Sequence, residues 1–433
     1  MVLRKIPRVA LFFTREQDHR VRQTARILLL LLACTAASLT TVPPAWGDVT
    51  SSVINDVLTI TGDEYDSDIN VTCADATLLV NYDEPDTGPA LCADLTSIVV
   101  TDDAGNDEVD LQRVRPGAFP AVTSVTADAG SGSDAVYGSG MPDAITGGDG
   151  SDEILADPLL GDTIDGGGGA DRLITSLASD VAISEDSIST PMGTFTFPGI
   201  EKLAILGGTE AQTIDGRAFN GTLGVSGKGG DDLILGGSGR NFLVGDRGTD
   251  HIVGGPGDDF LGGGEGGGDV VIGRAGDDHF TSFAGRGRMR GGPGDDSFCC
   301  VFGSNHAVFS GGPGTDSVRA FVDFGTAVVA DSYVISQGDR ARLRSIEEAS
   351  VTAPDAGGGI VIDASRFSGR TSLHGGAFGG DDVLIGGSGP DALFGHDGND
   401  ELSGGPGRDA LDGGSGTDAC DGGSGADSTN RCE

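Results

Sequence analysis

The chain has 433 residues, of which 76 are glycine and only one is tryptophan, and its formal net charge at pH 7 is −39. Such an acidic chain repels nucleic acid and anionic membranes, and its own charges oppose a compact state unless cations compensate them. Glycine falls short of the one-third that collagen requires and no G-X-Y register is present, so a collagen triple helix is excluded.

Residues 1–47 predict a signal peptide. Basic residues precede the apolar segment ILLLLLACTAASL, and small residues at Ala45 and Gly47 suit cleavage before Asp48. This segment is shorter than the roughly 20 residues of a membrane-spanning helix, and no later segment is long enough, so we expect no membrane span. The alternatives are an uncleaved anchor and a lipid anchor on Cys34, since LLAC loosely resembles a lipobox. We therefore expect a secreted, extracellular protein, with a cell-surface lipoprotein as the alternative.

Six cysteines follow the predicted signal peptide in a chain expected to reach an oxidising space. Cys73 with Cys92, and Cys420 with Cys432, are placed to form local disulfides. No CxxC or Cys/His zinc spacing occurs, so we expect no zinc site.

Residues 48–128 predict an amino-terminal β region. The segments VLTITG and TLLVNY within it have the composition of strands and suggest a β cap. An isolated nonapeptide, DDAGNDEVD, occupies residues 102–110 of this region.

A period of nine then dominates the chain. Units such as AGSGSDAVY, GKGGDDLIL and GGSGPDALF are rich in glycine over their first four positions and place aspartate at position six. They form a first array over residues 129–174, a second over 227–319 and a third over 377–430, followed by a tail at 431–433.

Two β-rich linkers separate the arrays, at residues 175–226 and 320–376. They share a pattern, since GIEKLAIL, TIDGRAF and GGDDLILGGSG recur as SIEEASVT, VIDASRF and GGDDVLIGGSG. The alternation TFTF at residues 194–197 supports strands. We expect both linkers to form irregular coils of one solenoid rather than separate domains.

Position eight of each unit distinguishes a folded repeat from a disordered acidic tract. A solvated tract has no reason to keep an apolar residue at the same position of every nonapeptide, whereas a short strand that points its middle side chain inward requires one there. We therefore expect a folded repeat. The residues at position eight are Ile234, Leu243, Ile252, Leu261, Val271, Phe280, Met289, Phe298 and Val318 in the second array, and Leu384, Leu393, Leu402, Leu411, Cys420 and Thr429 in the third.

The first six positions of the unit suit a cation. Glycines allow positive φ angles, so that carbonyl groups can turn into one small space, and the aspartate adds a carboxylate. An all-oxygen, partly anionic cage suits Ca²⁺ and discriminates against zinc or copper. For any single aspartate, the alternative is a turn-capping role. The candidate metal ligands are Asp134, Asp152, Asp171, Asp232, Asp250, Asp259, Asp269, Asp278, Asp296, Asp316, Asp382, Asp391, Asp400, Asp409, Asp418 and Asp427.

These units follow the pattern G-G-x-G-x-D-x-U-x and resemble the hemolysin-type calcium-binding repeats of the RTX family. The resemblance implies an all-β fold, a parallel β-roll or β-helix solenoid in which each unit makes a turn and a short strand and two units make one coil. It also implies that each calcium ion lies between the turn of one unit and the turn of the second unit after it. The implied pairs are Asp382 with Asp400, Asp391 with Asp409, Asp400 with Asp418, and Asp409 with Asp427.

Four positions depart from the pattern. Asn241 and Gly287 replace the aspartate of their units, and Met141 and Leu160 interrupt the glycines. Each departure weakens the expectation of a calcium site in its unit.

Bound calcium would supply the counter-charge that the chain lacks, so we expect folding to be coupled to calcium binding. The sequence thus predicts a secreted calcium-binding β-solenoid with a structural, matrix or surface-interaction role. Its partners would be calcium ions and extracellular polysaccharide or cell-surface components, and not nucleic acid.

A catalytic role is the alternative. The sequence contains no HExxH and no G-x-S-x-G motif, and His251 and His279 fall at position seven, which should face solvent. A secreted carbohydrate-active enzyme of the lyase or epimerase type remains the second hypothesis, because Arg286, Arg288 and Arg290 could meet an acidic sugar. These arginines could equally replace calcium's charge in a unit without aspartate. We assign no catalytic residue and favour a non-enzymatic role.

Overall fold

The structure is a computed structural model, and it describes residues 48–156, 161–281, 287–299, 307–322, 324–336, 338–353, 358–377 and 379–433. The predicted signal peptide, with Cys34, lies outside the described residues. Trp46–Glu433 form one compact unit. Every regular element in the described part of this unit is a β-strand, which confirms the all-β prediction. No helix in the described ranges has the length and hydropathy needed to cross a membrane.

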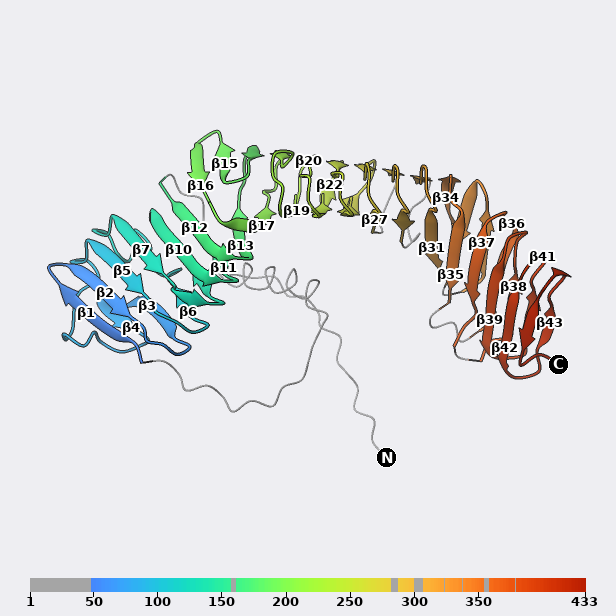
Figure 1. The fold of residues 1–433 in the computed structure, drawn as a ribbon, viewed down its shortest axis with the longest axis horizontal. Coiled ribbons are helices and arrows are strands. Elements are labelled where there is room, and N and C mark those ends of the chain that lie inside the picture. Colours follow the sequence, from blue (N-terminus) through green and yellow to red (C-terminus); the bar gives the residue numbers. More distant parts are fainter. Residues whose placement is uncertain are drawn as a thin grey trace, which may run out of the picture. The chain divides into compact units, whose positions relative to one another are not determined.

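The amino-terminal end folds as the predicted β cap (Figure 1). β1 (Thr50–Ile54) pairs antiparallel with β2 (Val57–Thr61), and β3 (Asp68–Ala74) pairs antiparallel with β4 (Thr77–Val80). A disulfide joins Cys73 to Cys92. β2 and β3 then pair in parallel with the first strands of two sheets, so the cap begins both.

The first of these two sheets, called sheet A below, is built mainly from parallel strands, which alternate along the chain with the strands of the second sheet. After β2 it contains β5 (Ser97–Thr101), β7 (Ser124–Asp128), β8 (Ser131–Gly132), β10 (Asp143–Gly150), β12 (Thr163–Gly169), β18 (Thr213–Asp215), β20 (Leu233–Leu235), β23 (His251–Val253), β26 (Val270–Ile272), β28 (Arg288–Arg290), β30 (Val308–Ser310), β36 (Val361–Arg366), β38 (Val383–Ile385), β40 (Glu401–Ser403) and β43 (Ala419–Asp421).

The second sheet, called sheet B, uses the alternate strands of the chain, again in parallel. After β3 it contains β6 (Glu108–Asp110), β9 (Ala135–Tyr137), β11 (Glu153–Leu155), β13 (Asp171–Ser176), β17 (Ile200–Leu206), β19 (Thr222–Ser226), β21 (Asn241–Val244), β24 (Phe260–Gly262), β27 (His279–Phe280), β29 (Ser297–Phe298), β31 (Ser317–Phe321), β35 (Glu348–Thr352), β37 (Arg370–His374), β39 (Asp391–Asp397), β42 (Ala410–Ser415) and β45 (Ser428–Asn430).

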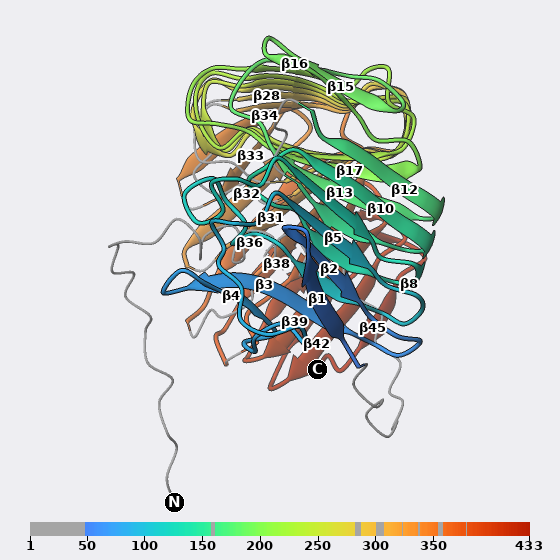
Figure 2. The same ribbon diagram turned by 90° about the vertical axis from the view of Figure 1, so that its left-hand side faces the viewer.

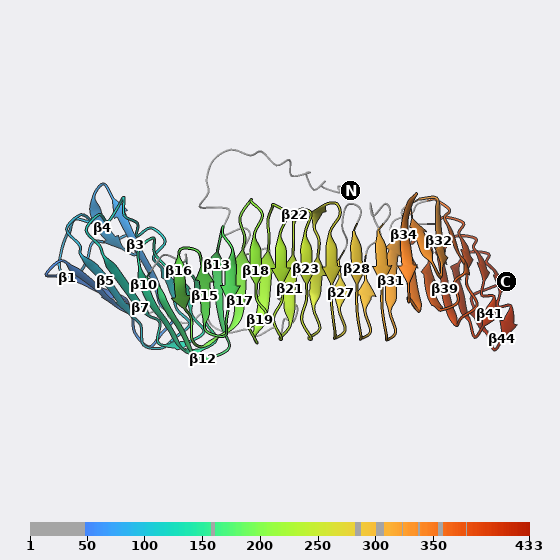
Figure 3. The ribbon, with the colours of Figure 1, turned by 90° about the horizontal axis from the view of Figure 1, so that it is seen from above.

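One coil of the repeat arrays contains two nonapeptides. Ile234 of β20 pairs with Ile252 of β23 in sheet A, and Leu243 of β21 pairs with Leu261 of β24 in sheet B. Consecutive units therefore contribute alternately to the two sheets, and the coils of the second array overlie one another as flattened loops (Figures 2 and 3). The predicted parallel β-roll is confirmed.

Both linkers continue the roll, and each adds an antiparallel meander at the equivalent place. In both, the first strand of the meander pairs in parallel with a strand of the next coil, which explains the sequence echo between the linkers. The strands are β14 (Val181–Ile183), β15 (Ser187–Thr190) and β16 (Gly193–Thr196) in the first linker, and β32 (Thr326–Ala330), β33 (Tyr333–Ser336) and β34 (Asp339–Arg344) in the second.

The core is a narrow column of side chains from position eight. All of the predicted inward residues are buried apart from Cys420, which is half-buried, and Thr429, which is exposed. Inside the second array, the rings of Phe280 and Phe298 stack with centroids 4.7 Å apart. At the carboxyl end, a disulfide joins Cys420 to Cys432 where core side chains run out.

The turns also pair with one another across coils. β22 (Arg247–Gly248) pairs with β25 (Glu265–Gly266), and β41 (Pro406–Gly407) pairs with β44 (Ser424–Gly425). Gly398, at position four of its unit, has φ +146°, and a Cβ at this position would collide with the carbonyl oxygen of Gly380 in the preceding coil. Glycine is therefore needed there both for the backbone conformation and for the close stacking of turns.

Candidate metal centres along the aspartate ladders

The aspartates at position six form hydrogen-bonded ladders along the roll. All of the predicted candidates are buried except Asp427, which is half-buried. The backbone N–H of most rungs donates to Oδ1 of the aspartate one coil later, so the four pairs implied by the resemblance are neighbours. The N–H to Oδ1 distances are 2.8 Å for Asp382 and Asp400, 2.9 Å for Asp391 and Asp409, 2.9 Å for Asp400 and Asp418, and 3.0 Å for Asp409 and Asp427.

The same geometry runs through the other two arrays, and two of the ladders end on a glutamate. Asp171 and Asp316 donate their backbone N–H groups to Oε2 of Glu201 and Glu347, at 2.9 and 3.0 Å. The rungs run Asp107, Asp134, Asp152, Asp171 and Glu201 in the first ladder; Gln212, Asp232, Asp250 and Asp269 in the second; and Asn241, Asp259, Asp278, Asp296, Asp316 and Glu347 in the third.

The second carboxylate oxygen of most rungs is buried without a hydrogen-bond partner. Buried polar atoms in folded proteins are nearly always paired, so a row of exceptions at one repeat position needs an explanation. The atoms are Oδ2 of Asp107, Asp134, Asp152, Asp171, Asp232, Asp250, Asp278, Asp296, Asp400, Asp409 and Asp418.

The glycine at position one leaves open the space beside this unpaired oxygen. A Cβ on Gly404 would lie 2.6 Å from Asp409 Oδ2 and 2.8 Å from the carbonyl oxygen of Gly422, one coil later. Gly395 has the same two kinds of neighbour, Asp400 Oδ2 and a carbonyl oxygen of the following coil. A carboxylate oxygen and a carbonyl oxygen thus converge on a small space that any side chain at position one would fill.

Asn241 shows which kind of group this environment accepts. Its side-chain Nδ2 donates to the carbonyl oxygen of Gly239 at 2.9 Å, to that of Gly237 at 3.2 Å and to Asp259 Oδ1 at 2.8 Å. Three oxygen acceptors therefore surround an electropositive amide. Where aspartate replaces asparagine, that donor is lost and another anionic oxygen is added, so a cation fits the environment better than any neutral group.

Electrostatics agree with this geometry. Burial is the main cause that raises the pKa of Asp134, Asp278 and Asp296 to about 7; the ladder hydrogen bond opposes the rise and neighbouring aspartates add to it. Burial likewise raises the pKa of Asp250 and Asp400 to about 6. Without a cation these carboxyls ionise only at higher pH than usual, and a cation beside them would favour the ionised form.

A second class of rung satisfies both carboxylate oxygens within the protein. Oδ2 of Asp259, Asp316 and Asp391 accepts a backbone N–H from the same unit, at 2.6, 2.8 and 2.6 Å. Asp382 does the same with Gly376 at 2.7 Å. These aspartates act as turn caps in the structure, which is the alternative role considered for any single aspartate.

The unit interrupted by Met141 behaves in this second way. Ser139 donates its backbone N–H to Asp143 Oδ2 at 2.8 Å and its hydroxyl to Asp143 Oδ1 at 2.5 Å. The departure from the glycine pattern thus coincides with a carboxylate held by a neighbouring serine. Leu160 lies outside the described residues.

Sequence reasoning missed several members of the ladders. Asp107 occupies position six of the isolated unit at residues 102–110, so the pattern itself contained the signal. Glu201 and Glu347 share an Ile-Glu dipeptide in the two linkers, and that echo was the only clue to their common place. Position five forms a further, exposed ladder in which Asn399 donates its N–H to Asp381 Oδ1 at 2.8 Å.

Side chains alone do not complete a metal site. Within the described ranges, no three or more His, Cys, Asp or Glu side chains gather as a metal-binding group. A bound ion would therefore need backbone carbonyl oxygens as well as carboxylates, as the turns supply. Arg288 and Arg290 lie exposed on either side of buried Met289, and neither forms an ion pair with a carboxylate that the structure describes; Arg286 lies outside that part of the chain.

Comparison with known proteins finds one family. The model of the RTX calcium-binding nonapeptide repeat (4 copies) matches residues 128–158, 161–182, 226–261, 263–298, 376–411 and 394–428. No curated protein matches the chain. The matched segments contain most of the buried ladder aspartates described above, whereas Asp107 and Asp316 lie outside them.

Proposed function

Because the chain carries RTX calcium-binding nonapeptide repeats, we propose that it is a secreted protein whose β-roll folds on binding calcium and serves a structural, matrix or surface-interaction role. The observation that carries this proposal is the row of buried carboxylate oxygens without partners, most of which lie beside an open space at a glycine. Calcium takes six to eight oxygen ligands in flexible geometry, and the turns offer only oxygen.

We assign the calcium ligands to the position-six aspartates of the three arrays, together with Asp107. Those with an unpaired Oδ2 can bind without losing any internal hydrogen bond, so they should fill first. Asp259, Asp316, Asp382 and Asp391 would each give up a backbone hydrogen bond and should bind more weakly. Bound calcium supplies positive charge, and the chain supplies an ordered array of oxygens to receive it.

Folding should depend on that charge. The core contributes about one inward side chain per nonapeptide, and the formal net charge of −39 opposes compaction. Ligand that binds the folded state alone stabilises it in proportion to the logarithm of ligand concentration over Kd. Extracellular modules bind calcium with Kd of roughly 10⁻⁴ to 10⁻³ M, which would let the chain fold after export.

Circular dichroism of residues 48–433 during a calcium titration tests the proposal, with magnesium as the control. We expect a cooperative change from coil to strand at sub-millimolar to millimolar calcium and none with magnesium, which keeps its water ligands more firmly. A full strand signal in chelator would contradict coupled folding and leave the aspartates as turn formers.

A secreted carbohydrate-active enzyme of the lyase or epimerase type is the second candidate. The observation that favours it is a pocket on the outer face of sheet B whose lining includes serines, arginines and a glutamate. Incubation of the calcium-loaded protein with uronate polymers, followed by chromatography of the products, separates the two roles, because a non-enzymatic protein leaves the polymer unchanged.

A further inference from the structure

A single row of outward side chains crosses sheet B from strand β21 to strand β37. Residues at position seven of successive coils pair in register, and Glu348 and Arg370 of the second linker continue the register, so the side chains lie side by side on the outer face. Along the row the side chains change from aromatic to hydroxyl-bearing and then to charged. The residues, in order, are Phe242, Phe260, His279, Ser297, Ser317, Glu348 and Arg370.

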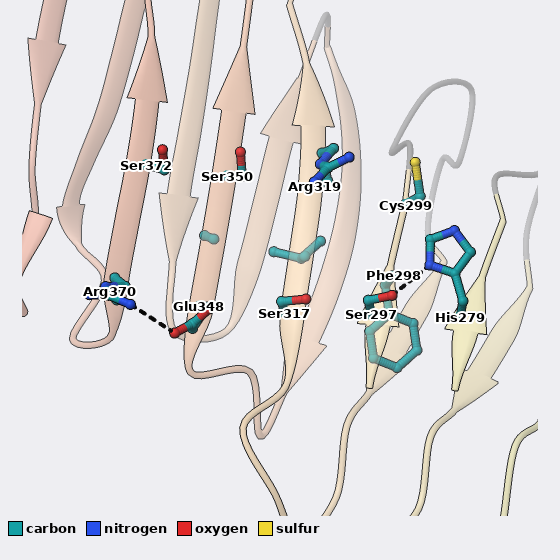
Figure 4. Close-up of a pocket in the computed structure, with 12 residues that line it drawn as sticks. His279, Ser297, Phe298, Cys299, Ser317, Arg319, Glu348, Ser350, Arg370 and Ser372 are labelled. Carbon is teal, nitrogen blue, oxygen red and sulfur yellow. Dashed lines mark hydrogen bonds and ion pairs between the residues drawn. The ribbon is translucent and has the colours of Figure 1, made fainter. Parts of the chain in front are cut away.

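A pocket of about 350 Å³ lies on this face over β27 to β37. Figure 4 shows its two rows, with His279, Ser297 and Ser317 in one and Arg319 and Ser350 in the other. Its volume is in the range of small-molecule sites. Most of its lining residues are polar or charged, but Phe298, Val318 and Ala349 beneath it also contribute substantial apolar surface.

The aromatic end of the row adjoins the pocket. The rings of Phe242 and Phe260 stack with centroids 5.2 Å apart, and His279 lies 5.1 Å from Phe260. The guanidinium of Arg240 lies 4.8 Å from the centroid of the Phe260 ring. Because Phe242, His279 and Arg240 pack against the ring of Phe260, the aromatic side chains extend the pocket as a half-exposed apolar strip beside a further guanidinium, rather than as an open ring face.

The pocket carries fixed positive charge on a strongly acidic molecule. Arg319 is exposed and forms no ion pair with a described carboxylate, while Arg370 lies 3.7 Å from Glu348. His279 shares a 2.6 Å hydrogen bond with Ser297 Oγ. Burial, and then the charge of Arg319, lower the pKa of His279, so the ring is neutral at pH 7. Two guanidinium groups against one carboxylate leave the pocket with a net positive charge.

These groups select one ligand chemistry. A free guanidinium holds a carboxylate through paired N–H donors, and four serine hydroxyls and Glu348 can exchange hydrogen bonds with ligand hydroxyls. The half-exposed aromatic strip adds apolar surface, which a small inorganic anion would not use.

We propose that this pocket binds an acidic saccharide, with the carboxylate of one sugar at Arg319, its hydroxyls at the serines, and a neighbouring sugar against the aromatic strip of Phe260 and Phe242. An acidic saccharide would be the ligand in the surface-interaction role proposed above. The inference rests on that proposal only because the pocket exists only in the folded roll. It uses the strand face and not the aspartate turns.

Isothermal titration of the calcium-loaded protein with hyaluronan tetrasaccharide, which contains glucuronate, tests the inference. Chitotetraose is the neutral control and sodium sulfate is the control for a simple anion site. We expect the acidic tetrasaccharide to bind and both controls to bind at least tenfold more weakly. Arg319→Gln should weaken binding by about tenfold or more, the value of a charge-assisted hydrogen bond. Phe260→Ala should weaken it several-fold.

Arg290→Gln is the matched control, because Arg290 is also an exposed arginine at position nine but lies on sheet A. It changes the net charge equally and should leave the affinity within about twofold. The inference is wrong if the folded protein does not bind the acidic tetrasaccharide, if chitotetraose or sulfate binds as tightly, or if Arg319→Gln and Arg290→Gln behave alike. Circular dichroism of each sample separates these results from a failure to fold, which would instead contradict the calcium proposal.

Discussion

At the scale of single residues, the two oxygens of each ladder aspartate have different roles. In Asp400, Oδ1 accepts the backbone N–H of Asp382 at 2.8 Å, whereas Oδ2 is buried and unpaired. The first oxygen joins neighbouring coils and would do so with or without metal. The second is unfavourable to bury unless something positive faces it. One aspartate side chain therefore both joins neighbouring coils and makes the fold depend on calcium.

The substitution Asp400→Asn should reduce calcium binding while stabilising the calcium-free roll. An asparagine there could hydrogen-bond to turn carbonyls as Asn241 does, removing an unpaired buried oxygen. We expect the free energy of unfolding in chelator to rise by about 1–3 kcal/mol. We also expect fewer bound calcium ions, measured by titration calorimetry and chemical denaturation.

Asp381→Asn is the matched control for this substitution. Asp381 precedes Asp382 in the same turn, but its Oδ1 belongs to the exposed ladder at position five, and the side-chain oxygen of asparagine can replace it. Calcium binding should be nearly unchanged. If both variants lose calcium equally, the effect is one of general negative charge, and the position-six assignment is wrong.

At the scale of elements, the sequence predicts the local repeat well. Glycine, aspartate and the apolar residue at position eight recur within one unit, so the turn, the strand and the inward side chain could all be predicted. Leu393 and Leu402, for example, are buried as expected. Coil length followed from the resemblance, and pairing 18 residues apart confirms it.

Features that join distant segments could not be predicted. Glu347 reaches Asp316 across 31 residues because a meander intervenes, and nothing in the spacing indicates that distance. The saccharide pocket likewise depends on Ser317 pairing with Glu348 across the same insertion. Outward positions also carry no repeated pattern, because their side chains do not have to fill a core.

The glutamates of the linkers should act as ladder ends. Glu347 accepts the last ladder N–H, that of Asp316, at 3.0 Å, so Glu347→Ala leaves this buried donor unpaired. We expect destabilisation by about 1–3 kcal/mol, concentrated at the junction between the second array and its linker. Hydrogen exchange of the Asp316 amide should accelerate.

Glu348→Ala tests whether this effect is specific. Glu348 is the next residue, and its carboxylate forms only a partly exposed ion pair with Arg370 at 3.7 Å. Such a pair contributes at most about 1 kcal/mol, so exchange at Asp316 should stay near the wild-type rate. Equal acceleration in both variants would show that the linker strand, and not the Glu347 carboxylate, holds the end of the ladder.

At the scale of the whole unit from Trp46 to Glu433, each coil contacts mainly its neighbours, so charge repulsion accumulates along the ladders without a large core to oppose it. In a stacked repeat the stability of each coil depends on its own interactions and on those with adjacent coils. Neutralising many rungs together should therefore have a far larger effect than neutralising one. Calcium does this by binding, and protons can do it by titration.

Acid should accordingly substitute in part for calcium. Burial and neighbouring carboxylates raise the pKa of Asp134, Asp278 and Asp296 to about 7 in the calcium-free fold, above the usual 3.8. Such groups bind more protons when folded than when unfolded, so their contribution to stability is complete below pH 3.8 and is lost as pH rises through about 7. In chelator, strand signal by circular dichroism should thus be stronger at pH 4 than at pH 8.

Adding calcium should abolish most of this difference, and calcium binding near pH 6 should release protons that are not released at pH 8. A chelated chain with no more strand at pH 4 than at pH 8 would mean that carboxylate repulsion does not control folding, and calcium would then have to act through local turn geometry alone.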